Sequence, residues 1–147
     1  MINDMEYNVL DLIPQRYPFL MIDKIISISP GEEAVALKNV SYGESWTQGH
    51  FPGAVVMPGN LIIEAMAQTS MLVLYDSSLK KQPQLGYLLN VNKVKFRQMV
   101  RPGDCLVIKS KLIIRLNNCI QVSNKCFVND KIIGEGELLL SIENKLI

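Results

Sequence analysis

One long apolar segment separates two regions in which hydrophobic and polar residues alternate. Apolar residues dominate from Ala54 to Leu74, and Pro58 suits the first turn of a helix, where its missing N–H costs nothing. The pattern predicts a helix from Pro58 to about Tyr75, roughly 27 Å long. Because apolar side chains cover nearly its whole circumference, the rest of the domain should wrap it on most sides. A membrane span is disfavoured, because polar residues including Glu64 interrupt the segment.

Strand-like patterns flank this helix. The predicted strands are Asp23–Ser29, Glu33–Val40, Leu85–Arg97, Asp104–Leu116, Cys119–Val128 and Lys131–Ile142, preceded by a short helix from about Asp4 to Ile13. Tight turns are expected at Pro30-Gly31, Asn117-Asn118 and Asn129-Asp130. In the fourth strand, one face should carry Leu106, Ile108, Ser110, Leu112, Ile114 and Leu116. The fold class is therefore α+β, an antiparallel sheet wrapped around one long central helix, in a single domain over residues 1–147.

Composition narrows the function classes. The 147 residues are 48% hydrophobic and 20% charged, with a net charge of +1, which excludes a bulk basic field for nucleic acid. Three cysteines, an odd number without Cys-x-x-Cys spacing, favour reduced, buried thiols in a cytosol. The acidic first residues do not have the pattern of a signal peptide. We therefore expect a cytoplasmic protein without a nucleic-acid partner or a membrane span.

A polar stripe interrupts the apolar helix. Asn60, Glu64 and Gln68 are spaced four residues apart and so share one helix face. A buried carboxylate is costly unless its pKa rises, and a carboxyl that keeps its proton near neutral pH can act as a general acid. Glu64 could equally face solvent at an uncovered helix edge or be satisfied by Gln68. Periodicity alone does not separate these interpretations.

The only histidine, His50, lies in Gly49-His50-Phe51-Pro52-Gly53, a segment that predicts a rigid loop just before the helix. An imidazole with a pKa near 6.5 can act as a base at neutral pH, although a lone loop histidine is more often packed or solvated. The amides near Gly59 and Asn60 at the helix start are suited to a carbonyl that gains negative charge. Together these features suit removal of a proton beside a carbonyl and protonation of a leaving group one carbon further on, a β-elimination.

These motifs closely resemble the signature of the β-hydroxyacyl-acyl carrier protein dehydratases, hot-dog-fold enzymes of bacterial dissociated fatty-acid synthesis. The resemblance covers most of the chain. Its motifs are Gly49-His50-Phe51-Pro52-Gly53, Met57-Pro58-Gly59 with Leu61 to Gln68, Arg16-Tyr17-Pro18-Phe19-Leu20 with Asp23, Val94-Lys95-Phe96-Arg97, and Val100-Arg101-Pro102-Gly103-Asp104.

The resemblance implies that a (3R)-3-hydroxyacyl chain on acyl carrier protein loses water to become the trans-2-enoyl thioester. His50 would be the base, Glu64 the acid, the Gly59 amide a donor to the thioester carbonyl, and Gln68 a support for the acid. Family sites lie at a homodimer interface, with the histidine of one subunit facing the glutamate of its neighbour, and trimers of dimers are common. No metal or organic cofactor is implied. Glutamate rather than aspartate at position 64 favours dehydration without isomerisation.

Further residues are candidates for binding. Phe51, Tyr17, Phe19, Met21 and Phe96 are candidates for the walls of an acyl tunnel, although any one of them could simply pack in the core. Lys93, Lys95 and Arg97 should alternate along one strand face, with Arg101 beyond, and could attract the acidic carrier protein or form an ordinary solvated face.

Two positions depart from the family pattern. Gln15 replaces a common histidine, and Asn60 replaces an apolar residue or cysteine. Our hypothesis is that Asn60 adds a polar contact near the thioester or Glu64 and alters rate or acyl preference; unchanged kinetics of Asn60→Val across chain lengths would count against it.

Three other functions compete with this prediction. The first is a dehydratase of a specialised polyene or lipid pathway, which would use the same chemistry on other chains. The second is a hot-dog acyl thioesterase, which would leave His50 without a role. The third is a non-catalytic, chain-binding partner of a second subunit, which the presence of both His50 and Glu64 disfavours.

Overall fold

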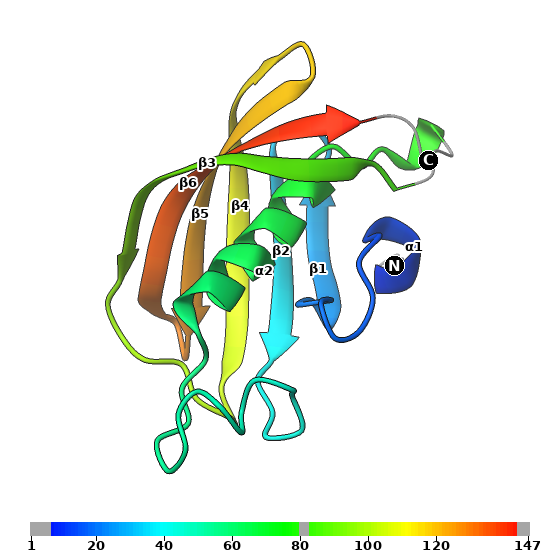
Figure 1. The fold of residues 1–147 in the computed structure, drawn as a ribbon. Helices are drawn as coiled ribbons and strands as arrows, with labels where there is room; N and C mark the ends of the chain where they lie inside the picture. Colours follow the sequence, from blue (N-terminus) through cyan, green and yellow to red (C-terminus); the bar gives the residue numbers. More distant parts are fainter. Residues whose placement is uncertain (1–6, 80–82, 144–147) are drawn as a thin grey trace.

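The computed structural model describes residues 7–79 and 83–143, and in them one antiparallel six-stranded sheet carries a long helix on its inner side (Figure 1). The strand order is β1-β2-β4-β5-β6-β3. The elements in chain order are α1 (Val9–Leu12), β1 (Lys24–Ser29), β2 (Glu33–Asn39), α2 (Gly59–Leu72), a 3-10 turn (Ser77–Leu79), β3 (Leu85–Phe96), β4 (Cys105–Leu116), β5 (Cys119–Val128) and β6 (Lys131–Glu143). The predicted fold class, α+β with the sheet around one helix, is confirmed.

Helix α2 is buried against the sheet but is shorter than the sequence predicts. Ala65 and Met66 are fully buried, and α2 contacts β2, β3, β4 and β5. The helix ends at Leu72, so it is about 21 Å long. Beyond that point the amides of Leu74 and Tyr75 donate to carbonyls three residues back, and the Val73 carbonyl accepts from Gly31 in the β1–β2 turn at 2.6 Å. This tertiary contact takes a carbonyl that would otherwise continue the helix.

Local sequence signals place the turns correctly. Gly31 has a φ of 74°, and the β5–β6 turn places Asn129 and Asp130 at φ 49° and 63°, the left-handed region in which these residue types are tolerated. Strand β5 has the predicted bounds, and the other strand bounds agree within two residues. The predicted N-terminal helix is observed only as α1, with its Asn8 side chain accepting from the amide of Leu10; positions 4–6 of that prediction lie outside the described residues.

Two predictions about burial are wrong. In β4 the register shifts between Leu112 and Ile114, which changes the face on which later side chains lie. Ile114 and Leu116 are therefore 46% and 63% exposed instead of sharing the core face. Among the cysteines only Cys126 is buried, and burial raises the pKa of its thiol to about 12, whereas Cys105 is exposed and Cys119 half-buried.

A buried polar cluster joins α2 to the sheet. Ser70 on α2, Ser110 on β4 and Asn124 on β5 are at most 1% exposed. Both serine hydroxyls donate to Oδ1 of Asn124, at 3.1 Å from Ser70 and 2.5 Å from Ser110. A buried hydroxyl without a partner is costly, so these bonds favour a single position of the helix over the strands.

We predict that Asn124→Ala lowers the free energy of unfolding by about 1–3 kcal/mol, because it leaves the buried Ser110 hydroxyl without its acceptor. Urea denaturation measures this difference. Asn39→Ala, at an exposed position on β2, is the matched control and should change stability by less than about 0.5 kcal/mol. Equal midpoints for Asn124→Ala and the wild type would contradict the importance of the cluster.

Candidate active site

His50 lies in the loop between β2 and α2, and backbone hydrogen bonds hold this loop in shape. The His50 amide donates to the Trp46 carbonyl at 3.1 Å, and the Val56 amide donates to the His50 carbonyl at 3.0 Å. Phe51 and Ala54 exchange hydrogen bonds in both directions within the same turn. The loop is attached to the turn before β4, where the Met57 amide donates to the carbonyl of Val100 at 2.7 Å. The rigid loop expected from the two glycines and the proline is therefore observed.

The tautomer of His50 follows from the partner of its ring. Nδ1 lies 2.7 Å from the Val56 carbonyl oxygen, which can only accept a hydrogen bond. Nδ1 of the neutral imidazole must therefore carry the proton, and Nε2 has a free lone pair. A neutral His50 thus presents Nε2 as a base in an orientation set by the loop itself. Sequence reasoning missed Val56, because its backbone carbonyl leaves no residue-type signal.

Glu64 is half-buried on α2 and is held by Gln68 one turn further on. Gln68 is 2% exposed, and its Nε2 donates to Glu64 Oε1 at 2.9 Å and to the Phe19 carbonyl at 2.8 Å. Its Oε1 accepts from the Met21 amide at 2.8 Å. Because the backbone offers an acceptor on one side and a donor on the other, the carboxamide has only one satisfied orientation. Gln68 thus attaches the carboxyl group of Glu64 to the segment before β1.

The surroundings of Glu64 favour its protonated form. Burial raises the pKa of the Glu64 carboxyl, and the hydrogen bond from Gln68 opposes that effect without cancelling it. The carboxyl therefore keeps its proton to a higher pH than an exposed glutamate. A protonated carboxyl group can donate to a leaving group, which is the role of a general acid.

The first amides of α2 remain available beside an aromatic ring. Gly59 and Asn60 begin the helix, and their N–H groups donate to no acceptor in the described part of the chain. A methyl group at Gly59 would lie 2.9 Å from Cε2 of Phe96, so a larger residue would require the Phe96 ring to move. Orphan amides at the positive end of a helix dipole are suited to bind a carbonyl oxygen with developing negative charge.

Several predicted binding residues are not brought together within one chain. No hydrogen bond joins His50 to Glu64 among residues 7–79 and 83–143, and Asn60 makes none to Glu64 there, so the effect of Asn60 on rate or acyl preference stays a prediction. Tyr17, Phe19, Phe51 and Phe96 are exposed, Tyr17 to 78%, whereas Met21 packs in the core. Gln15 accepts a hydrogen bond from Arg16 through its backbone carbonyl.

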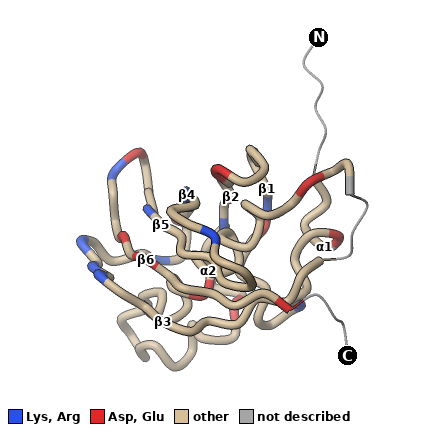
Figure 2. The backbone as a smooth tube through the Cα atoms, turned by 90° about the horizontal axis from the view of Figure 1, so that it is seen from above, with Lys and Arg blue, Asp and Glu red and all other residues tan. Residues whose placement is uncertain are grey.

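The predicted basic face on β3 is irregular and partly neutralised. A register shift between Asn92 and Lys95 breaks the expected alternation of Lys93, Lys95 and Arg97. Lys93 pairs with Glu137 at 3.5 Å and Arg97 with Glu135 at 2.8 Å, so positive and negative positions lie together along β3 and β6 (Figure 2). The exposed Arg101 lies in the next turn and donates its amide to Asp104. Sequence periodicity missed the two glutamates because they come from another strand.

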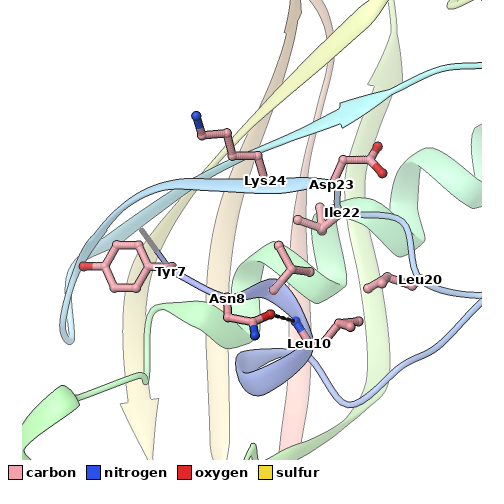
Figure 3. A pocket seen from close by; sticks show the side chains of 8 residues that line it. Tyr7, Asn8, Leu10, Leu20, Ile22, Asp23 and Lys24 are labelled. Atoms are coloured by element: carbon pink, nitrogen blue, oxygen red, sulfur yellow. Dashed lines mark hydrogen bonds between the residues drawn. The ribbon is translucent and has the colours of Figure 1, made fainter. Parts of the chain in front are cut away.

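A hollow of about 580 Å³ lies elsewhere, between α1 and the start of β1 (Figure 3). Its lining combines apolar side chains with a few polar ones: Tyr7, Asn8, Val9, Leu10, Leu20, Ile22, Asp23 and Lys24. Neither His50 nor Glu64 contributes to it. No residue pattern in the sequence predicts this hollow.

Comparison with known families decides the classification. The family model described as "FabA-like domain" matches residues 13–137. The chain belongs to the FabA-like family. Its relatives include proteins named 3-hydroxyacyl-[acyl-carrier-protein] dehydratase FabZ. The one from Desulfotalea psychrophila is 43% identical over 134 residues, with 90% of this chain and 89% of that protein covered. The one from Caldicellulosiruptor saccharolyticus is 40% identical, with 92% and 96% covered.

Solved structures support the fold of this FabA-like chain. A chain of the dehydratase heterocomplex ApeI:P from Xenorhabdus doucetiae is 20% identical and matches with a TM-score of 0.81, covering 95% of this chain and 93% of that one. Cj0977 from Campylobacter jejuni matches with a TM-score of 0.70 at 15% identity, covering 95% and 98%. The sheet wrapped around α2 is the hot-dog fold. Within the described residues, no helix is both long enough and apolar enough to cross a membrane.

The raised pKa of Glu64 predicts a pH-dependent stability difference. A carboxyl whose pKa is higher in the folded than in the unfolded protein binds its proton more tightly when folded. The free energy of unfolding that this tighter proton binding contributes is fully present below the unfolded pKa of about 4.5. It is lost as the pH rises through the pKa of the folded protein. Glu64→Gln should therefore gain stability relative to the wild type across this window, measured by urea denaturation from pH 4 to pH 8.

Glu32→Gln, at an exposed position in the β1–β2 turn, is the matched control. Its curve of unfolding free energy against pH should run parallel to that of the wild type. A Glu64→Gln curve that also stays parallel to the wild type would mean that burial does not raise the pKa of Glu64.

Proposed function

We propose that this FabA-like chain removes water from (3R)-3-hydroxyacyl thioesters of acyl carrier protein in fatty-acid biosynthesis, with His50 as the base and Glu64 as the acid. Identities of about 40% to 3-hydroxyacyl-[acyl-carrier-protein] dehydratases, over about nine-tenths of this chain, support the activity. The observation that carries the residue roles is the orientation of the His50 ring together with the burial of Glu64. The Val56 carbonyl at Nδ1 leaves Nε2 as the unprotonated nitrogen of a neutral imidazole, and burial raises the pKa of the Glu64 carboxyl.

The reaction then proceeds by transfer of two protons. Nε2 of His50 removes the proton on C2, and the electron pair of that bond forms the C2=C3 double bond. The bond from C3 to the hydroxyl oxygen breaks, and the Glu64 carboxyl protonates the departing hydroxyl, which leaves as water. The amides of Gly59 and Asn60 bind the thioester carbonyl while the C2 proton is removed. The imidazolium and carboxylate that remain return to their starting states by exchanging protons with solvent.

A site shared between two subunits accounts for the lack of a hydrogen bond between His50 and Glu64 within the described part of one chain. Strand β3 is at an edge of the sheet and exposes apolar side chains: Tyr87, Leu88, Leu89 and Val91. An exposed apolar edge strand can pair with a second chain. Pairing through β3 would also cover the side of Phe96 and bring a second copy towards the start of α2. We propose a homodimer of this kind, and trimers of such dimers as a larger assembly.

The proposed dimer would also form the surface that binds the substrate. Phe51, Tyr17, Phe19 and Phe96 expose aromatic surface that a second chain and an acyl group would cover together, which is why we keep them as candidates for tunnel walls. Lys95 and Arg101 form no ion pair among the described residues, so these two cations are better candidates for contacting an acidic carrier protein than Lys93 and Arg97. A cytoplasmic location suits this partner.

Mixing two inactive variants tests both the residue roles and the shared site. His50→Ala and Glu64→Gln homodimers should each lose hydration of an enoyl thioester on acyl carrier protein, the reverse reaction, followed by ultraviolet absorbance. In a hybrid dimer, one site loses both groups and the other keeps both. Random subunit mixing should restore about a quarter of wild-type activity, because about half of the dimers are hybrids with one intact site of two.

Native mass spectrometry of the mixture serves as the control for hybrid formation. Confirmed hybrids without regained activity would place both groups of a site in the same chain. Full activity of His50→Ala by itself would remove the base from the mechanism.

A further inference from the structure

A buried lysine lies close to the His50 loop, and the proposed chemistry does not use it. Lys38 on β2 is 5% exposed, and its Nζ lies 2.7 Å from Oε1 of Glu44 in the loop that follows the strand. A buried ammonium group is costly unless it is paired and hydrogen-bonded. The ion pair therefore connects strand β2 of the sheet to the loop that carries His50.

Both carboxylate oxygens of Glu44 accept hydrogen bonds or pair with a cation. Oε1 binds Lys38 and accepts from the Ser41 amide at 3.4 Å, and Oε2 accepts a hydrogen bond from the indole N–H of Trp46. The same loop is closed by the Thr47 hydroxyl, 2.8 Å from the carbonyls of Tyr42 and Glu44. With both oxygens occupied, the Glu44 side chain has one satisfied position, and Trp46 is held by it.

Trp46 in turn holds the backbone of His50. The Trp46 carbonyl accepts from the amide of Gly49 at 3.2 Å and from the amide of His50 at 3.1 Å. The indole ring also packs against the core. A continuous series of polar contacts therefore runs from Lys38 through Glu44 and Trp46 to the residue that carries the imidazole.

We propose that Lys38, Glu44 and Trp46 are positioning residues that hold the His50 imidazole in its reactive orientation. This inference rests on the proposed function, because it takes His50 as the base. None of the three residues needs to touch the substrate. If Lys38 loses its charge, Glu44 is left half-buried without a cation and turns towards water, and the indole loses its acceptor. The carbonyl of Trp46 then no longer fixes the His50 amide, and Nε2 loses its alignment with the C2 proton.

The chain offers an unusually direct readout, because it has one histidine and one tryptophan. Nitrogen-15 NMR therefore gives signals from one imidazole ring and one indole N–H group, each assigned without ambiguity. Lys38→Met keeps the apolar stem and removes the charge, whereas Lys38→Arg keeps the charge. Trp46→Phe removes the indole donor together with part of the ring that packs against the core, but it keeps an aromatic side chain and leaves the ion pair of Lys38 and Glu44 in place. Lys109→Met, at an exposed position on β4, is the matched control.

In Lys38→Met we expect the indole and imidazole signals to move and kcat to fall at least about tenfold, with KM for carrier-bound substrate changed less than about twofold. Lys38→Arg should restore most of kcat and both signals, and Lys109→Met should match the wild type. Trp46→Phe should move the imidazole signal and lower kcat in the same direction. A role in stability alone would lower the unfolding temperature and leave the imidazole signal and kcat of the folded protein unchanged.

An unmoved imidazole signal in folded Trp46→Phe, with kcat as in the wild type, would overturn the inference. If Lys38→Met fails to fold, the Trp46→Phe result decides alone. Failure of the proposed function is distinguishable, because it would appear as retained activity in His50→Ala, whereas failure of this inference leaves His50→Ala inactive and the imidazole signal insensitive to its neighbours.

Discussion

The packing of α2 on the inner side of the sheet is the constraint on which the site depends. Ala65 and Met66 are fully buried, and the cluster of Ser70, Ser110 and Asn124 favours one position of the helix over the strands. With one side of the helix so constrained, the stripe that carries Glu64 can only lie on another side. The orphan amides at Gly59 are located by the same packing, because they begin the same helix. The proposed acid and the proposed carbonyl site thus share one rigid element.

Main-chain atoms orient the side chains of the candidate site. The Val56 carbonyl sets the tautomer of His50, and the backbone of Phe19 and Met21 orients Gln68, which binds Glu64. Each functional group is therefore held by a neighbour that is itself held by main-chain atoms. Such an arrangement limits the reorganisation needed when a substrate binds, which is how preorganised sites lower a barrier. Lys38 and Glu44 extend the same principle from the sheet to the His50 loop.

The sequence predicts what depends on local pattern and misses what depends on tertiary contact. The turns at Pro30-Gly31 and Asn129-Asp130 were predictable because few residue types accept their backbone angles, and β5 was predictable from its flanking turns. The end of α2 was not, because the Gly31 amide that binds the Val73 carbonyl comes from a distant turn. The register shift in β4 leaves no signal in an apolar run, so the alternating pattern predicts the wrong face for Ile114 and Leu116. The sequence does show Glu64 and Gln68, four residues apart on one helix face, and His50 in its loop of glycines and proline. The orientation of each side chain depends on partners that periodicity does not show.

A crystal structure with a bound substrate mimic tests most directly whether one substrate lies between the two groups. The useful complex is the Glu64→Gln variant with a 3-hydroxyacyl pantetheine thioester. We expect a dimer in which C2 of the acyl group lies within reach of Nε2 of His50 from one subunit, and the hydroxyl lies beside position 64 of the other. An acyl chain bound away from both groups, for example in the hollow beside α1, would contradict a shared site for elimination.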